Sequence, residues 1–331
     1  MRTTVLRLLT AALLAFPLLL SAQGAPGAAG EPRRERSVRP RLADGHPDMQ
    51  GVWVNGTLTP FERPVELGTK AFYTEDELAQ TLRQLAARRA AAAKNPRPGD
   101  VGGDNEAFVD SGYQWLPTRQ TSLVVDPPDG RLPIRPEVLA RQKVNLDSRD
   151  DYETMSPWDR CITRGPTLLL PAGYNNATRI VQASGLVMLE AEMIHEARIV
   201  PTDGRPHAPA RVRHWLGDPR GRWEGDTLVI DTTNFHERGW ISTHAGSGRL
   251  RGLPNSHSLH TVEKLTMIDA DTIIYEITVA DPVVYTRPWT VSMPLIRDSG
   301  YSMYESACHQ GNQAIELVLR GARYEEQQLG R

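Results

Sequence analysis

The chain has 331 residues, a formal net charge of −2 at pH 7 and a 40% share of hydrophobic residues. A chain of this length can bury a substantial core, as one large domain or two small ones. The nearly balanced charge argues against a general nucleic-acid binder and against a protein held on a membrane surface by its charge. We expect a small-molecule ligand or substrate as the partner. The oligomeric state is left open.

The N-terminal residues predict an exported protein. Arg2 and Arg7 precede or border an apolar run over residues 8–20, and small residues follow from Ser21. This order is typical of a secretory signal peptide, and the run is shorter than the roughly 20 residues that a membrane span needs. We expect a signal peptide over 1–22, a flexible Gly-, Ala-, Pro- and Arg-rich tether over 23–42, and a periplasmic or secreted location. An amphipathic helix of the folded domain is the alternative.

One strong helix is predicted in the otherwise irregular segment 43–178, which we expect to wrap around the rest of the fold. Thr74, with Glu77 three residues later, forms a capping box, and leucines then recur at helical spacing. Pro96 and Pro98 would break a helix, so we expect it to span 74–94 and to be the longest in the chain. Shorter elements are expected at 51–54 (strand), 121–126 (strand) and 135–144 (helix).

From residue 179 the pattern changes to hairpins. Val, Ile, Thr, Tyr and Trp dominate short runs that are separated by turns such as Ser184-Gly185 and Gly225-Asp226. Consecutive hairpins without helices between them predict a mostly β fold, an antiparallel meander over 179–325 that forms one domain with 43–178. Closure into a β-barrel would remove exposed edges, and a strongly curved sheet is the alternative. We expect strands at 179–183, 186–192, 195–200, 258–268, 272–279 and 288–294, two more around Gly225, and a short helix at 311–323 laid on the sheet.

The chain has two cysteines, Cys161 and Cys308. In an exported protein an even number of cysteines predicts a disulfide. The link would close a long loop, for which the chain-entropy model gives roughly 4–5 kcal/mol. The alternative is a thiol nucleophile paired with His309, but adjacent residues on a strand point to opposite faces.

Several stretches carry a resemblance to a known family. The longer ones are 193–207 (MIHEARIVPTDGRPH), 215–235 (WLGDPRGRWEGDTLVIDTTNF) and 272–289, which ends in YTRPW; the shorter ones are 159–165 (DRCITRG) and 307–312 (ACHQGN). They resemble a large family of exported, functionally uncharacterised bacterial proteins of acidobacterial type, over nearly the whole mature chain. The resemblance implies export and no particular activity. The hairpin around Gly225 is also similar to those of lipocalin-like barrels.

No common catalytic template fits the sequence. His195-Glu196 begins a zinc-protease pattern, but position 199 is Ile instead of His. Polar residues gather instead on the strand expected from 195 and in the turn after it. We expect His195 to line a cavity, where a nearby carboxylate orients it as a general base. The predicted catalytic residues are His195, Glu196, Asp203 and His207; the alternative is that the charged residues of this stretch form structural ion pairs.

Further polar and aromatic residues are predicted to bind the substrate. They are Arg198, Arg205, Trp215, Trp223, His260, Glu263, Tyr285 and Trp289. Glu263 and Glu276 lie on neighbouring expected strands, where two carboxylates could meet for acid–base work on sugars; cross-strand ion pairs are the alternative. Zinc binding by His195, His207 and His260 is a further alternative, but the close spacing of a typical histidine site is missing, so we expect no metal and no cofactor.

Two functions remain open at this point. The first is an envelope enzyme, a hydrolase, lyase or isomerase that acts on a small or saccharide-like substrate by acid–base chemistry. The second is a non-catalytic, lipocalin-like barrel that binds an apolar small molecule or serves an envelope assembly. A cavity lined by histidines and carboxylates would favour the enzyme, and an apolar cavity would favour the carrier.

Overall fold

The computed structural model of the protein describes residues 39–94, 114–147, 150–242 and 249–330. The predicted signal peptide and all but the last four residues of the predicted tether lie outside these ranges. Those four residues include Arg39 and Arg41, which both pair with Asp226 in the turn between two strands. The last four residues of the segment that we expected to be a flexible tether are thus attached to the barrel.

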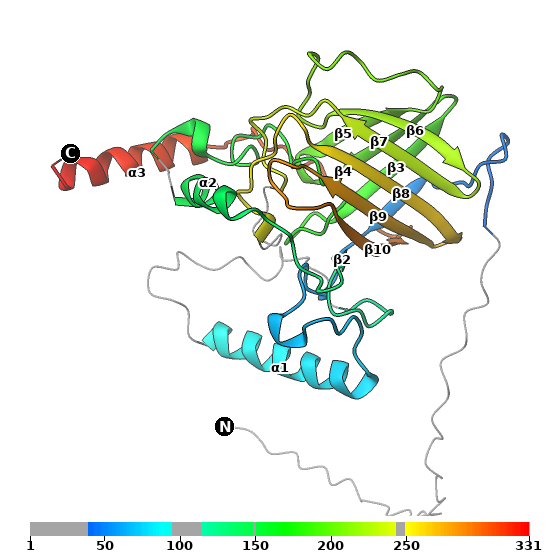
Figure 1. Ribbon diagram of the computed structural model, residues 1–331, viewed down its shortest axis with the longest axis horizontal. Helices are drawn as coiled ribbons and strands as arrows, with labels where there is room; N and C mark the ends of the chain where they lie inside the picture. The colour runs from blue at the N-terminus through cyan, green and yellow to red at the C-terminus, as the bar shows by residue number, and fades with distance from the viewer. Residues whose placement is uncertain (1–38, 95–113, 148–149, 243–248, 331) are drawn as a thin grey trace, which may run out of the picture. The chain divides into compact units, whose positions relative to one another are not determined.

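Ten strands form one sheet in the described part of the chain (Figure 1). They are β1 (Gly51–Val54), β2 (Val124–Asp126), β3 (Ala177–Ala183), β4 (Leu186–Ala191), β5 (Glu196–Pro201), β6 (Asp218–Glu224), β7 (Thr227–Thr233), β8 (His260–Asp269), β9 (Thr272–Ala280) and β10 (Trp289–Arg297). The order is β5-β4-β3-β1-β10-β9-β8-β7-β6, every recorded pairing is antiparallel, and β2 pairs with β10 off this path. The mostly β, antiparallel fold is confirmed.

The sheet curves into a barrel that is nearly closed. Its two edge strands, β5 and β6, meet at a seam without forming a hydrogen-bonded ladder. At the seam a Cβ on Gly221 would lie 2.8 Å from Cγ2 of Thr202 and 2.9 Å from Cγ1 of Val200, closer than real Cβ contacts. Only glycine lets β6 approach β5 this closely.

The barrel interior follows the period of two that strands impose. On β9, Ile273, Tyr275, Ile277 and Val279 are fully buried, and the residues between them are partly exposed. They belong to one hydrophobic cluster that also takes in large side chains such as Trp53 and those of the other strands. Burying a large aliphatic side chain stabilises a fold by about 1.5–3 kcal/mol, so this cluster is the main source of stability.

The predicted long helix is confirmed as α1 (Glu75–Lys94), with Thr74 as its N-cap. The Glu77 amide donates to Oγ1 of Thr74 over 3.3 Å, and the Thr74 amide donates to Oε2 of Glu77 over 2.8 Å, which is a capping box. The hydrogen bonds from Lys70 and from the Thr74 amide lower the pKa of Glu77 to about 2.

We expect Thr74→Ala to open α1 locally. The helix N-terminus would lose its side-chain acceptor, at a cost of about 1 kcal/mol. Hydrogen exchange of the α1 amides should therefore accelerate about fivefold. Thr69→Ala, an exposed position before the helix, is the control. Equal exchange in the two variants would contradict the capping role.

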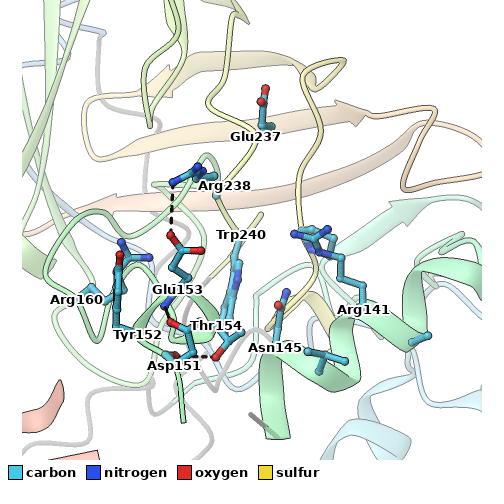
Figure 2. Close-up of a pocket in the computed structure, with 14 residues that line it drawn as sticks. Arg141, Asn145, Asp151, Tyr152, Glu153, Thr154, Arg160, Glu237, Arg238 and Trp240 are labelled. Atoms are coloured by element: carbon cyan, nitrogen blue, oxygen red, sulfur yellow. Dashed lines mark hydrogen bonds and ion pairs between the residues drawn. The ribbon is translucent and has the colours of Figure 1, made fainter. Parts of the chain in front are cut away.

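The other helices are α2 (Pro136–Asp147) and α3 (Ala314–Gln328), with short 3-10 turns at η1 (Val65–Leu67), η3 (Tyr152–Thr154) and η4 (Met193–His195). The helices α2 and η3 line a cleft together with residues 237–240 (Figure 2). The helix α3 differs from the expectation that it lies on the sheet. It has no buried residue, and its first turn lines a hollow with Asn145, Met155 and Trp240. None of the helices in the described ranges is both long and apolar enough to cross a bilayer.

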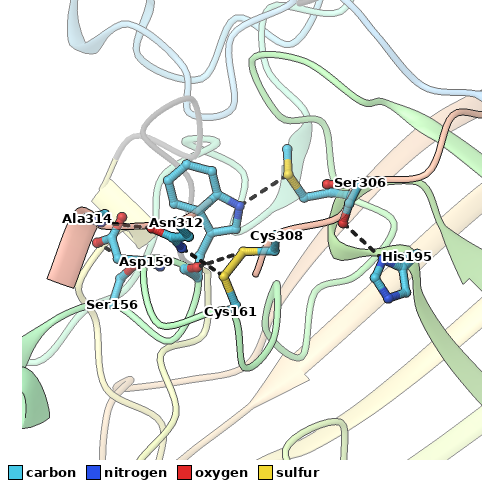
Figure 3. Close-up of a disulfide and its surroundings, with 10 residues drawn as sticks. Ser156, Asp159, Cys161, His195, Ser306, Cys308, Asn312 and Ala314 are labelled. Carbon is cyan, nitrogen blue, oxygen red and sulfur yellow. Dashed lines mark hydrogen bonds between the residues drawn. A yellow bond between two sulfur atoms is a disulfide. The ribbon is translucent and has the colours of Figure 1, made fainter. Parts of the chain in front are cut away.

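The predicted disulfide between Cys161 and Cys308 is confirmed, with the two Cα atoms 5.6 Å apart (Figure 3). Asn312 donates to Sγ of Cys161 over 3.0 Å. The bond joins the irregular segment before β3 to the segment before α3. It therefore fixes the C-terminal part of the chain beside the irregular segment that carries Cys161.

Candidate functional site

The segment 202–217, between β5 and β6, is attached to the outer surface of the barrel. Asn234, the residue after β7, donates to the Ala208 carbonyl over 2.9 Å, and Nε of Arg220 donates to the Pro206 carbonyl over 2.9 Å. Asp231 alternates along β7 with the buried residues Ile230 and Thr232, so it points outward. These contacts bring His207 against the outward side chains of β6, β7 and β8.

Asp231 bridges two histidines at this surface. Its Oδ1 lies 3.0 Å from Nε2 of His207, and its Oδ2 lies 2.8 Å from Nε2 of His260. The histidines come from different elements, because His207 lies in the 202–217 segment and His260 begins β8. All three side chains are about one third exposed or more, so the cluster is open to solvent.

Asp218 and Arg220 hold His207 from the other side. Oδ2 of Asp218 accepts the Ala208 amide at 2.7 Å and lies 3.1 Å from Nδ1 of His207, and Arg220 donates to Oδ1 over 2.6 Å. Burial raises the pKa of Asp218, but the hydrogen bonds from Ala208, Arg220 and His207 outweigh it and leave the pKa below its ordinary value. Both ring nitrogens of His207 thus face carboxylates, and both can donate when the ring is an imidazolium.

His260 is the member of this cluster that can exchange a proton with a bound molecule. When its Nε2–H donates to Asp231, the neutral ring keeps its lone pair on Nδ1. Nδ1 has no hydrogen-bond partner among the described residues, and the side chain is 42% exposed. An imidazole held by a carboxylate through one nitrogen and free at the other is the arrangement of a general base.

A second polar cluster lies inside the barrel. Arg198 of β5 reaches Glu263 of β8 through two contacts, NH2 to Oε1 at 2.9 Å and NH1 to Oε2 at 2.7 Å, and the Tyr275 hydroxyl donates to Oε1 over 2.8 Å. Burial alone would lower the pKa of Arg198, but Glu263 outweighs it and raises that pKa. Burial, together with the Glu263 charge, raises the pKa of Tyr275. Both charged side chains are almost completely buried, so we interpret the pair as structural.

Glu196 has an anchoring position at the start of β5. Its Oε2 accepts the Thr163 hydroxyl and the Arg164 amide, both over 2.9 Å. Burial raises the pKa of Glu196, and it lowers the pKa of Arg164 to about 10. The Arg164 guanidinium donates to the Leu170 carbonyl. Glu196 therefore fastens the segment after Cys161 to the barrel.

The structure does not place His195 as expected. The residue lies in η4, before β5 begins, and Ile194 and His195 have φ values of 63° and 43°. The predicted strand start at 195 is thus wrong by one residue, because the left-handed turn rotates the side chain away from the strand pattern. His195 is exposed, and its Nδ1 lies 2.9 Å from the Ser306 carbonyl instead of a carboxylate (Figure 3). The inward polar residue of this stretch is Arg198.

The remaining predicted site residues are spread over the molecule. Asp203 and Arg205 pair with each other in an exposed turn. Trp215 stacks on His236, and Trp223 stacks on His46, each with ring centroids 4.6 Å apart. Tyr285 and Trp289 are buried and contact each other edge to face.

The expected meeting of Glu263 and Glu276 does not occur. Glu263 pairs with Ile277 and points inward, whereas Glu276 pairs with Lys264 on the outer face. The zinc alternative also lacks its three histidines in one place, because His195 lies at η4 and the other two lie at Asp231. No group of three or more His, Cys, Asp or Glu in the described ranges is arranged to hold a metal ion.

Asp231 is the residue that sequence reasoning missed. Its signal was available, because it alternates with buried positions on a predicted strand next to the strand that His260 begins.

Comparison of the chain with protein-family models, with curated proteins and with solved structures gave no match.

Proposed function

We propose that the protein is an exported acid–base enzyme, a hydrolase, lyase or isomerase, that acts on a small or saccharide-like substrate. The observation that carries this proposal is the Asp231 carboxylate shared by His207 and His260. His260 is the general base in this proposal, and Asp231 orients it. The signal-peptide pattern and the disulfide support export to the periplasm or beyond, and we propose membership of the exported bacterial family on the quoted motifs.

The proton balance of this site is simple. In hydrolysis, a water gives a proton to Nδ1 of His260, its O–H electron pair forms the new bond to the substrate, and the bond to the leaving group breaks with its electron pair on the leaving group. In elimination or isomerisation, the substrate gives the proton and the electron pair of its C–H bond stays on the substrate. The resulting imidazolium keeps its Nε2–H on Asp231, whose negative charge stabilises it. The same proton then passes from Nδ1 to the leaving group or product. Such general acid–base transfer contributes about 10²–10⁴-fold to a rate.

Packing in the barrel favours this proposal over the carrier. The interior positions hold fully buried side chains, among them Trp53, Tyr275 and Trp289, which pack into one cluster. A carrier for an apolar molecule needs an apolar cavity of some hundreds of cubic ångströms. The clustered histidines and carboxylates instead lie on the outer surface, at the 202–217 segment.

The test is turnover of a panel of neutral and acidic oligosaccharides and aryl esters, followed by product analysis. We expect the wild-type protein to convert at least one class, and His260→Gln to reduce kcat about 100-fold or more. His257→Gln is the matched control, since His257 is exposed and lies three residues away. Equal kcat in His260→Gln and His257→Gln would overturn the proposal, as would a wild-type protein that converts no member of the panel.

A further inference from the structure

A cleft of about 650 Å³ lies apart from the Asp231 cluster, and none of that cluster's residues lines it (Figure 2). One wall is α2, with Arg141 and Asn145. The opposite wall is η3 together with Arg160, which follows it in the chain. Residues 237–240 and Pro254 complete the cleft. This volume lies within the range of small-molecule sites.

The acidic side chains of the cleft have partners, whereas two of its arginines have no carboxylate partner in the described part of the chain. Glu153 pairs with Arg238 at 3.8 Å, and Glu237 pairs with Arg213, which does not line the cleft. Asp151 accepts the Glu153 amide over 2.9 Å. The three carboxylates of the cleft therefore have partners.

Two guanidinium groups of the cleft have no carboxylate partner among the described residues. Arg141 forms no ion pair within the described ranges. Arg160 lies over the ring of Tyr152, and its Cζ is 5.4 Å from the centroid of that ring. A guanidinium presents planar pairs of N–H donors that match a carboxylate. The cleft is thus prepared for an anionic group of a ligand.

The rest of the lining suits a polyhydroxylated molecule better than a bare anion. The carboxylates of Asp151 and Glu153 can accept hydrogen bonds from hydroxyl groups, which a bare inorganic anion does not offer. Asn145 can donate and accept. Tyr152, which is 52% exposed, offers an aromatic ring at the rim.

We propose that this cleft binds an acidic saccharide, a short oligosaccharide whose sugar rings carry carboxylates. Arg141 and Arg160 bind the carboxylates, and the acidic side chains of η3 accept the sugar hydroxyls. The proposal goes beyond the acid–base function, because it concerns a second site with its own residues.

Titration calorimetry with the whole protein tests this proposal. The probes are trigalacturonate, its neutral counterpart galactotriose, and inorganic sulfate. We expect trigalacturonate to bind at least tenfold more tightly than the other two, and Arg141→Gln and Arg160→Gln each to weaken it about tenfold. Arg88→Gln on α1 is the matched control for the loss of one positive charge, since Arg88 is exposed and does not line the cleft.

The proposal would be overturned by no binding of trigalacturonate, by equal binding of the neutral sugar, or by equal loss in Arg88→Gln and Arg160→Gln. Sulfate binding as tight as that of trigalacturonate would show a general anion site and would also overturn the saccharide assignment. His260→Gln should bind trigalacturonate as the wild-type protein does. Failure of the catalytic proposal is therefore distinguishable from failure of this one.

Discussion

Removal of the Cys161–Cys308 disulfide is expected to lower the free energy of unfolding by about 5 kcal/mol in the chain-entropy model. The two cysteines are 147 residues apart, so the bond removes much freedom from the unfolded chain. The double variant Cys161→Ser, Cys308→Ser avoids a lone thiol. Denaturant unfolding of the oxidised wild-type protein and of this variant gives the difference directly.

The folded state retains other contacts that hold the C-terminal segment to the barrel. The Tyr301 hydroxyl donates to Glu192 over 2.9 Å, and the Tyr304 amide donates to the same carboxylate over 3.2 Å. We therefore expect the variant to fold with lower stability instead of losing its C-terminal segment. Reduced wild-type protein is the control, and its free energy of unfolding should equal that of the double variant. A difference below about 1 kcal/mol would contradict the expected constraint on the unfolded chain.

Arg198→Met is expected to destabilise the fold by about 3–5 kcal/mol, because it leaves the Glu263 charge buried without its partner. The double variant Arg198→Met, Glu263→Leu should recover most of that loss, since it removes both buried charges. Denaturant unfolding measures both variants. Arg179→Met is the matched control: it breaks the Arg179–Glu190 pair on β3 and β4, which is 3.1 Å long and partly exposed.

An exposed pair of this kind contributes about 0–1 kcal/mol. If Arg198→Met and Arg179→Met lower the free energy of unfolding equally, burial of the inner pair does not decide how much that pair contributes to stability. A double variant less stable than Arg198→Met would also contradict the account, because it would mean that Leu cannot replace Glu263 in the barrel.

The strands could be predicted because their pattern is local. Alternation of apolar and polar residues with short turns identified the hairpins β3-β4, β6-β7 and β8-β9. Closure of the barrel could not be predicted in the same way. It depends on β1, which pairs with both β3 and β10 across more than a hundred residues, and no local pattern specifies such a partner.

The site was predictable only in part for the same reason. His207 and His260 were candidates, but the residue that joins them, Asp231, lies 24 and 29 positions away. The expected place of His195 on a strand was wrong because a local pattern cannot reveal the left-handed backbone at 194–195. Arg198 and Glu263 were candidates for binding, and the choice between substrate binding and mutual pairing depends on which face of each strand points inward.

The central claim is that Asp231 and His260 act as one unit in proton transfer. The measurement is kcat of Asp231→Asn, His260→Gln and the double variant, on the substrate that the wild-type protein converts. Residues that act as a unit have non-additive effects on kcat. We expect each single variant to lose about 100-fold or more, and the double variant to lose no more than His260→Gln alone. Losses that multiply in the double variant, or wild-type kcat in Asp231→Asn, would contradict the account.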